Sequence, residues 1–339
     1  MLDELINKTH RQIFCHNKNI GHQFIPNLKA RIINENGGYY VQTNSTGFRS
    51  NIEFKEKKNN KPRILFFGDS NTAADGVSNK ERFSDLVGKY FDAEVYNYGL
   101  SGTGTDQQYL IWKNYAQNIK ADLIVLCVLV ENIERNKVAY RESINPFTKE
   151  PSFIPKPYFD YSNGELLLKN FPIPRARDNI SSIEEDMIQW AIPKKQEFIY
   201  NFINILRQSK IFNPIRKKFD NSLKKIRSFL ISNFYQPYPD YKKHDSKGNL
   251  LMNKILSKFI DSLPSIPVII LPIPTYHYYV DGAKPIYKKF FQNFENKKQN
   301  LFVLDLLKNL NKLDFNTRQN LCFKNDKSHF SKFGHKKIS

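Results

Sequence analysis

The chain has 339 residues, of which 40% are hydrophobic, including 27 Phe and 18 Tyr, so it can build a core and wholesale disorder is excluded. Its net charge of +19 admits an anionic membrane surface or an acidic glycan as a partner. A nucleic-acid partner is not expected, because no RNA-recognition, KH or helix-turn-helix signature accompanies the charge.

The first part of the chain, residues 1–60, is predicted to be an N-terminal extension, in which residues 37–44 have the pattern of a strand that enters a turn. In the remainder, 61–339, apolar strands and amphipathic helices alternate. The predicted strands span 64–67, 93–96, 123–130, 268–273 and 301–304, and the predicted helices span 80–90, 105–119, 252–263 and 285–294. This alternation predicts one α/β domain, a flavodoxin-like three-layer α/β/α sandwich with a parallel sheet.

The alternation lapses between residues 140 and 250, which we interpret as a large insertion that caps one edge of the sheet. Five prolines between 151 and 174 predict irregular, extended chain there. The segment 207–227 then carries eight Lys or Arg against one acidic residue, and its apolar residues recur near helical spacing. Two interpretations stay open: a helix packed on the body with a solvated basic face, or a helix that lies on a membrane surface.

The most informative motif is Gly-Asp-Ser at 68–70, directly after the first predicted strand of the body. A buried strand that stops there places the Ser70 hydroxyl at the carboxyl edge of the sheet, where open α/β sheets bind ligands. Serine needs a base to become a nucleophile. His329 is the leading candidate, because Asp326 stands three residues before it, close enough in a turn to orient the ring.

Two further strand ends carry groups that could bind an oxyanion. A Gly-rich bend, 97–107, follows the second strand and opens a helix with Thr105 as its predicted N-cap, and its backbone N–H groups can point at a developing negative charge. Phosphate binding is the rival interpretation, although the bend lacks the spacing of a Walker loop. The third strand ends at Val130-Glu131-Asn132, where the Asn132 amide could donate another hydrogen bond, or where the polar residues simply form a turn.

Together these residues resemble the SGNH (GDSL-like) hydrolase family, in particular its bacterial polysaccharide-associated members. Gly-Asp-Ser is similar to the family's first block, and Asp326 with His329 is similar to its last block. The bend around Gly102 resembles the block that supplies a backbone oxyanion donor, and residues 44–49 resemble a segment found before the first block. The resemblance covers residues 40–130 and 250–339.

The third block departs from the family pattern Gly-x-Asn-Asp. Strict alignment puts Glu131 in the oxyanion position, where a carboxylate repels the oxyanion unless it is protonated. A shift of one residue makes Asn132 the donor, and we favour that register. Glu131 is then expected to pair with Arg135 or with a substrate hydroxyl.

The resemblance implies a serine-dependent esterase that needs no cofactor or metal and acts on an O-acylated, in particular O-acetylated, carbohydrate of the bacterial envelope or capsule. Ser70, His329 and Asp326 would form the triad, and Gly102 and Asn132 the oxyanion hole. A polysaccharide O-acetyltransferase with the same triad is one alternative. A non-catalytic protein that binds a glycan or a membrane surface is another, and Glu131 favours it.

Other histidines rank lower as site residues. His277 follows the fourth strand beside aromatic residues that could stack on a sugar, whereas His335 is expected to be structural. Three more histidines lie near Cys15, but their spacing fits no common metal site; they are His10, His16 and His22.

The cysteines and the N-terminal residues indicate in which cellular compartment the protein is expected. Cys15, Cys127 and Cys322 are an odd number without CxxC spacing, so neither a disulfide framework nor a zinc site is expected. No secretion signal and no apolar run of about 18 residues is recognised. We therefore expect a cytoplasmic protein, with the inner face of the membrane as an alternative location.

Overall fold

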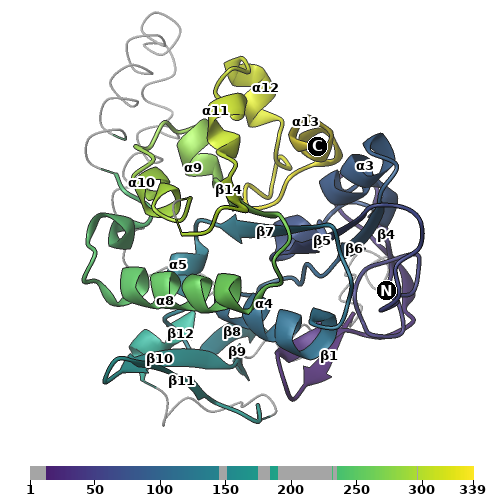
Figure 1. The fold of residues 1–339 in the computed structure, drawn as a ribbon. Helices are drawn as coiled ribbons and strands as arrows, with labels where there is room; N and C mark the ends of the chain where they lie inside the picture. The colour runs from purple at the N-terminus through teal and green to yellow at the C-terminus, as the bar shows by residue number, and fades with distance from the viewer. Residues whose placement is uncertain (1–12, 145–150, 175–183, 190–230, 232–234, 296) are drawn as a thin grey trace, which may run out of the picture.

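The computed structural model describes residues 13–144, 151–174, 184–189, 231, 235–295 and 297–339 (Figure 1). The basic stretch 207–227 and His10 lie outside these residues. Within the part of the chain that is described, no helix is both long enough and apolar enough to cross a membrane.

The centre of the molecule is a parallel sheet of five strands in the order β14-β13-β7-β5-β6. Its strands are β5 (Arg63–Phe67), β6 (Glu94–Asn97), β7 (Leu123–Leu129), β13 (Val268–Ile273) and β14 (Leu301–Val303). All five predicted strands are present, and their order is that of flavodoxin-like folds, in which the connections reverse direction between β5 and β7. Such a reversal opens a crevice at the carboxyl ends of these two strands.

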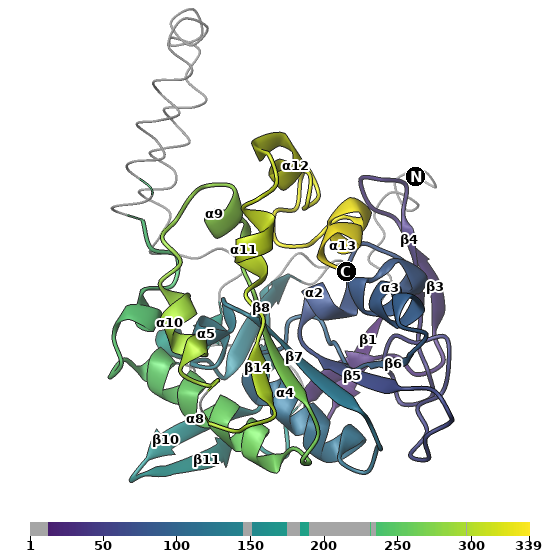
Figure 2. The ribbon, with the colours of Figure 1, turned by 45° about the horizontal axis from the view of Figure 1, so that its top comes forward.

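Helices cover both faces of this sheet, which confirms the predicted three-layer sandwich (Figures 1 and 2). One face carries α4 (Thr105–Ile111) and α8 (Lys247–Ser262), and the other carries α3 (Phe83–Tyr90), α11 (Leu306–Leu310) and α13 (Lys332–Ile338). The shorter helical elements are α2 (Ser70–Ala73), η1 (Asn79–Glu81), η2 (Trp112–Ala116), α5 (Asn132–Arg135), η3 (Glu185–Met187), η5 (Pro239–Lys242), α9 (Tyr276–Tyr279), α10 (Tyr287–Gln292) and α12 (Phe315–Gln319).

Two helix boundaries differ from the prediction. Gly104, not Thr105, is the N-cap of α4, and the helix passes into the π-helical turn η2 instead of continuing to residue 119. Helix α8 begins before residue 252, because Ser246 caps it by accepting a hydrogen bond from the backbone N–H of Asn249 at 3.3 Å. The first turn of α8 is polar, so apolar periodicity alone does not reveal it.

The described part of the insertion is rich in strands. Strands β8 (Tyr140–Ile144), β9 (Pro151–Pro155) and β12 (Ile188–Gln189) form a small sheet, and β10 (Tyr158–Ser162) pairs with β11 (Glu165–Lys169) in a hairpin that contacts α8 and α4. The chain over 151–174 is therefore extended, as predicted, but the prediction that it is irregular is wrong. Pro151 and Pro155 stand at the ends of β9, an edge strand, where a missing backbone N–H costs little.

The N-terminal segment forms two hairpins and then packs against the nucleophile region. The hairpins pair β1 (Phe14–Asn17) with β2 (Gly21–Phe24), and β3 (Lys29–Ile32) with β4 (Tyr39–Gln42). Strand β4 is the one predicted within 37–44.

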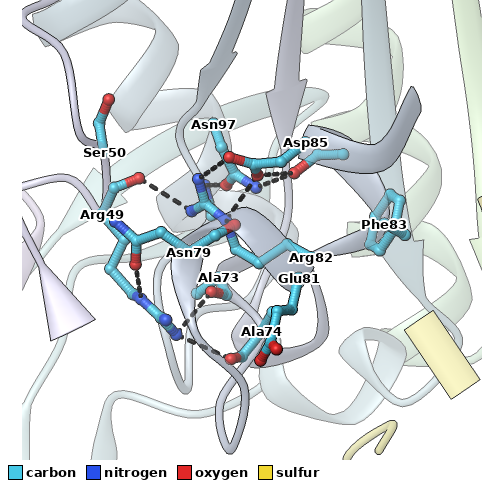
Figure 3. Close-up of polar contacts among 12 residues, drawn as sticks. Arg49, Ser50, Ala73, Ala74, Asn79, Glu81, Arg82, Phe83, Asp85 and Asn97 are labelled. Carbon is cyan, nitrogen blue, oxygen red and sulfur yellow. Dashed lines mark hydrogen bonds and ion pairs between the residues drawn. The ribbon is translucent and has the colours of Figure 1, made fainter. Parts of the chain in front are cut away.

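Arg49, the last residue of the segment 44–49, is fully buried, and its guanidinium contacts the carbonyls of Ala73 and Ala74 at the end of α2 (Figure 3). Its Nη1 donates hydrogen bonds to the carbonyls of Ala73 and Ala74 at 2.8 and 2.7 Å, and its Nη2 donates to that of Val77 at 2.6 Å. The last carbonyls of a helix have no partner within the helix. Arg49 satisfies those at the end of the helix that begins with Ser70, and thereby fixes this helix to the N-terminal segment.

Candidate active site

Ser70 is the first residue of α2, at the crevice between the ends of β5 and β7, and it is 5% exposed. Asp69 caps this helix by accepting a hydrogen bond from the N–H of Asn71 at 3.0 Å. Gly68 is required between strand and helix, because a Cβ there would lie 2.0 Å from Thr72 Oγ1. The strand-to-helix turn therefore presents the serine at a helix N-terminus, where negative charge is stabilised.

His329 and Asp326 form the couple predicted from their spacing. His329 Nδ1 is hydrogen-bonded to Asp326 Oδ2, and the other carboxylate oxygen accepts from the backbone N–H of Ser328 at 2.9 Å. A carboxylate on Nδ1 holds the proton on that nitrogen and leaves Nε2 as the basic one. The ring is therefore in the tautomer that general-base catalysis requires.

Asn71 joins the loop of His329 to the helix of Ser70, a role that the sequence analysis did not assign. Its Nδ2 donates to the carbonyl of Ser328 at 3.1 Å, and its Oδ1 accepts from the N–H of Phe330 at 3.3 Å. One side chain thus holds the residues on both sides of His329. Although 258 residues separate Asn71 from His329 in the sequence, the candidate nucleophile and base are brought together by the side chain next to Ser70.

A further carboxylate, Asp75, lies near the histidine. Its Oδ1 accepts a hydrogen bond from Ser101 Oγ at 2.7 Å. Burial by itself would lower the pKa of His329, but the hydrogen bond to Asp326 and the charges of Asp75 and Asp326 outweigh it and raise that pKa. Burial would raise the pKa of Asp326, yet its contacts with His329 hold this pKa below the ordinary value. The couple is therefore arranged to stabilise an imidazolium.

Gly102 lies in the bend after β6 with φ of +75°, a conformation that favours glycine. The bend is held from the N-terminal segment, because His22 Nε2 donates to the carbonyl of Ser101 at 2.8 Å. Burial lowers the pKa of His22 to about 4, so the ring is neutral near pH 7. Of the histidines near Cys15, His22 thus supports the bend that contains Gly102.

Glu131 has the partner that was predicted for it, whereas Asn132 is enclosed in the protein. Glu131 is ion-paired with Arg135 at 3.0 Å, as the register favoured above allows, and Arg135 also pairs with the fully buried Asp69 at 3.0 Å. Asn132 is 0% exposed, and its Nδ2 lies 3.5 Å from Thr105 Oγ1. The Asn132 amide therefore joins two helix N-termini inside the protein and presents no surface to a substrate.

The other histidine candidates have defined contacts. His277 Nδ1 lies 3.1 Å from Asp281 Oδ2, and its Nε2 lies 3.4 Å from Tyr235 Oη. His335 is buried, and its Nδ1 accepts a hydrogen bond from the N–H of Phe83 at 3.2 Å. Both rings are tied to the scaffold.

A cleft of about 460 Å³ opens beside the couple of His329 and Asp326. Its walls come from the β3–β4 hairpin, the turn after α2 and the loop of His329, and they include Asn34, Glu35, Tyr39, Asp75, Phe323, Asn325 and Asp326. The N-terminal segment therefore lines the site. Among the described residues, no three His, Cys, Asp or Glu side chains gather where they could hold a metal ion.

Comparison with known proteins finds no matching family model and no matching curated protein. Solved structures with a similar fold include a member of the lipolytic protein G-D-S-L family from Veillonella parvula, at 12% identity and a TM-score of 0.39, covering 81% of this chain and 93% of that one. Another is LAE5, an alpha/beta hydrolase enzyme from the metagenome of Lake Arreo, Spain, at 10% identity and a TM-score of 0.39, covering 84% of this chain and 93% of that one. A third is a catalytic mutant of an acetylxylan esterase from Geobacillus stearothermophilus, at 11% identity and a TM-score of 0.37, with the same coverages. At these values the activity of the chain has to be inferred from its own residues.

Proposed function

We propose that this protein is a serine-dependent esterase that removes an acyl group, in particular acetyl, from a carbohydrate. One observation carries the proposal: Asn71, beside Ser70, bonds to both neighbours of His329, whose Nδ1 is held by Asp326. This contact supports a site in which Ser70 is the nucleophile, His329 the base and Asp326 the orienting acid. This is the arrangement that acyl transfer through a serine requires.

The reaction proceeds in two halves. Ser70 Oγ attacks the acyl carbon while His329 Nε2 takes its proton, and Asp326 stabilises the imidazolium. Collapse of the tetrahedral intermediate breaks the bond to the sugar oxygen, which leaves with that proton. Water, deprotonated by His329, then attacks the acyl-serine and releases the acid, restoring the free hydroxyl.

The cleft beside His329 supports a sugar as the leaving alcohol. It combines carboxylate and amide groups of Glu35, Asp75 and Asn34, which can bind hydroxyls, with the aromatic rings of Tyr39 and Phe323. Its carboxylates would repel an acidic group. We therefore propose that a neutral sugar ring binds in this cleft. The net charge of +19 can attract anionic partners to other parts of the surface, but the cleft itself is lined by carboxylates.

Steady-state hydrolysis of p-nitrophenyl acetate by the purified protein tests the proposal. We expect turnover that is lost in Ser70→Ala and kept in Ser265→Ala, a control at an exposed serine. Equal rates in the wild type and Ser70→Ala would refute the assignment.

The acceptor is tested with an O-acetylated xylo-oligosaccharide, with and without an unacetylated oligosaccharide. Release of acetate supports the esterase, whereas acetyl transfer to the second sugar without acetate release indicates the transferase. Binding of the oligosaccharide that persists in Ser70→Ala, with no turnover of any ester by the wild type, would indicate a non-catalytic glycan-binding protein.

A further inference from the structure

The proposed reaction creates an oxyanion for which the third strand end supplies no accessible donor. Asn132 is 0% exposed, and Glu131 accepts hydrogen bonds from the guanidinium of Arg135. Neither side chain can donate a hydrogen bond to a substrate oxygen at the surface of the crevice. The backbone N–H groups near Ser70 and Gly102 then need a partner from elsewhere in the fold.

Arg141, on strand β8 of the insertion, lies directly against the oxyanion bend. A Cβ placed on Gly102 would be 1.6 Å from Arg141 Nη1 and 2.8 Å from Cζ, so the guanidinium occupies the space that a side chain at position 102 would take. Arg141 is an exposed residue. Across the described parts of the chain, its side chain has no hydrogen-bond or ion-pair partner, so its donors are available to a bound molecule.

The charges around Arg141 explain why a free cation is needed at this point. Asp69, Asp75 and Glu131 all interact electrostatically with its guanidinium. Arg135 is already shared between Asp69 and Glu131. An oxyanion that forms beside these carboxylates requires a cation that is not committed to any of them, and a charged donor forms the stronger hydrogen bond.

We infer that Arg141 is a catalytic residue, whose guanidinium donates a hydrogen bond to the oxyanion beside the N–H of Gly102. It takes the place that the sequence analysis assigned to Asn132. When Ser70 attacks, the carbonyl π electrons move to the acyl oxygen, and this oxygen accepts from Gly102 and Arg141; when the sugar leaves, the carbonyl re-forms. No proton is transferred to or from Arg141. The inference rests on the proposed esterase function.

The test measures kcat and KM of Arg141→Ala, Arg141→Lys and Asn132→Ala with p-nitrophenyl acetate, with Lys289→Ala as the control at an exposed cation. Loss of one oxyanion donor should lower kcat of Arg141→Ala by about 100-fold and leave KM nearly unchanged. Arg141→Lys should keep part of the activity, since it keeps the charge. Asn132→Ala should retain most of its kcat.

Chemical rescue separates catalysis from a structural role. Millimolar guanidinium chloride should restore part of kcat to Arg141→Ala and none to Ser70→Ala, and melting temperatures show that both variants are folded. The inference is overturned if the kcat of Arg141→Ala for p-nitrophenyl acetate stays within about threefold of the wild type, or if guanidinium chloride does not restore any of its lost activity. Absence of Ser70-dependent turnover in the wild type would instead overturn the proposed function.

Discussion

The link between Asn71 and the loop of His329 can be tested by removing it. Asn71→Ala abolishes the hydrogen bonds to Ser328 and Phe330, at 3.1 and 3.3 Å, while Ser70, His329 and Asp326 remain. A neutral intramolecular hydrogen bond contributes about 1 kcal/mol net, so the two together hold the loop by about 2 kcal/mol. Because 1.36 kcal/mol is a factor of ten, the rate should fall by up to about 30-fold.

The assay is kcat for p-nitrophenyl acetate, with the melting temperature of each protein. Asn114→Ala is the matched control, because Asn114 is exposed and, among the residues described, its side chain bonds within its own helical segment, to the carbonyl of Leu110 at 2.7 Å. We expect the control to keep wild-type kcat. A folded Asn71→Ala protein with kcat within twofold of the wild type would show that the loop of His329 is held by other contacts, and would refute this reasoning.

Three further predictions address the couple, the buried arginine and the bend. His329 must be neutral to accept a proton, so a pH–rate profile should show kcat/KM falling as the pH drops through its raised pKa. Asp326→Asn removes the carboxylate that raises this pKa, so the fall in kcat/KM should move to lower pH, and kcat should drop by about 10³- to 10⁴-fold. Arg49→Met leaves buried carbonyls without donors and should lower the free energy of unfolding in urea by about 3 kcal/mol. Arg31→Met, at an exposed arginine, should lower it by under about 0.5 kcal/mol, and equal unfolding midpoints for the two variants would contradict this prediction. Gly102→Ala keeps the backbone N–H, but a Cβ at a φ of +75° and 1.6 Å from Arg141 Nη1 would displace both the bend and the guanidinium from the oxyanion. We therefore expect kcat to fall by up to about 100-fold, and unchanged kcat would remove the bend from the oxyanion site.

The sandwich could be predicted because its signals are local. Each strand of the sheet is a short apolar run that side chains from both covering layers bury, and the prediction for β13 matches residue for residue. The Asp326–His329 contact was also predictable, because a separation of three residues in a turn limits how far apart the two side chains can lie. In contrast, β8 and β9 were missed, since prolines at the ends of an edge strand carry the same signal as irregular chain.

The fold class and the candidate residues for acyl transfer could therefore be predicted from the amino-acid sequence alone. The tertiary structure decided how they are held and which neighbours they have: Asn71 reaches the loop of His329, Arg49 binds the end of the Ser70 helix, and Arg141 lies on Gly102. These contacts join residues that are far apart in the chain. Local patterns report burial and backbone conformation, whereas a contact between distant segments depends on how the whole chain packs.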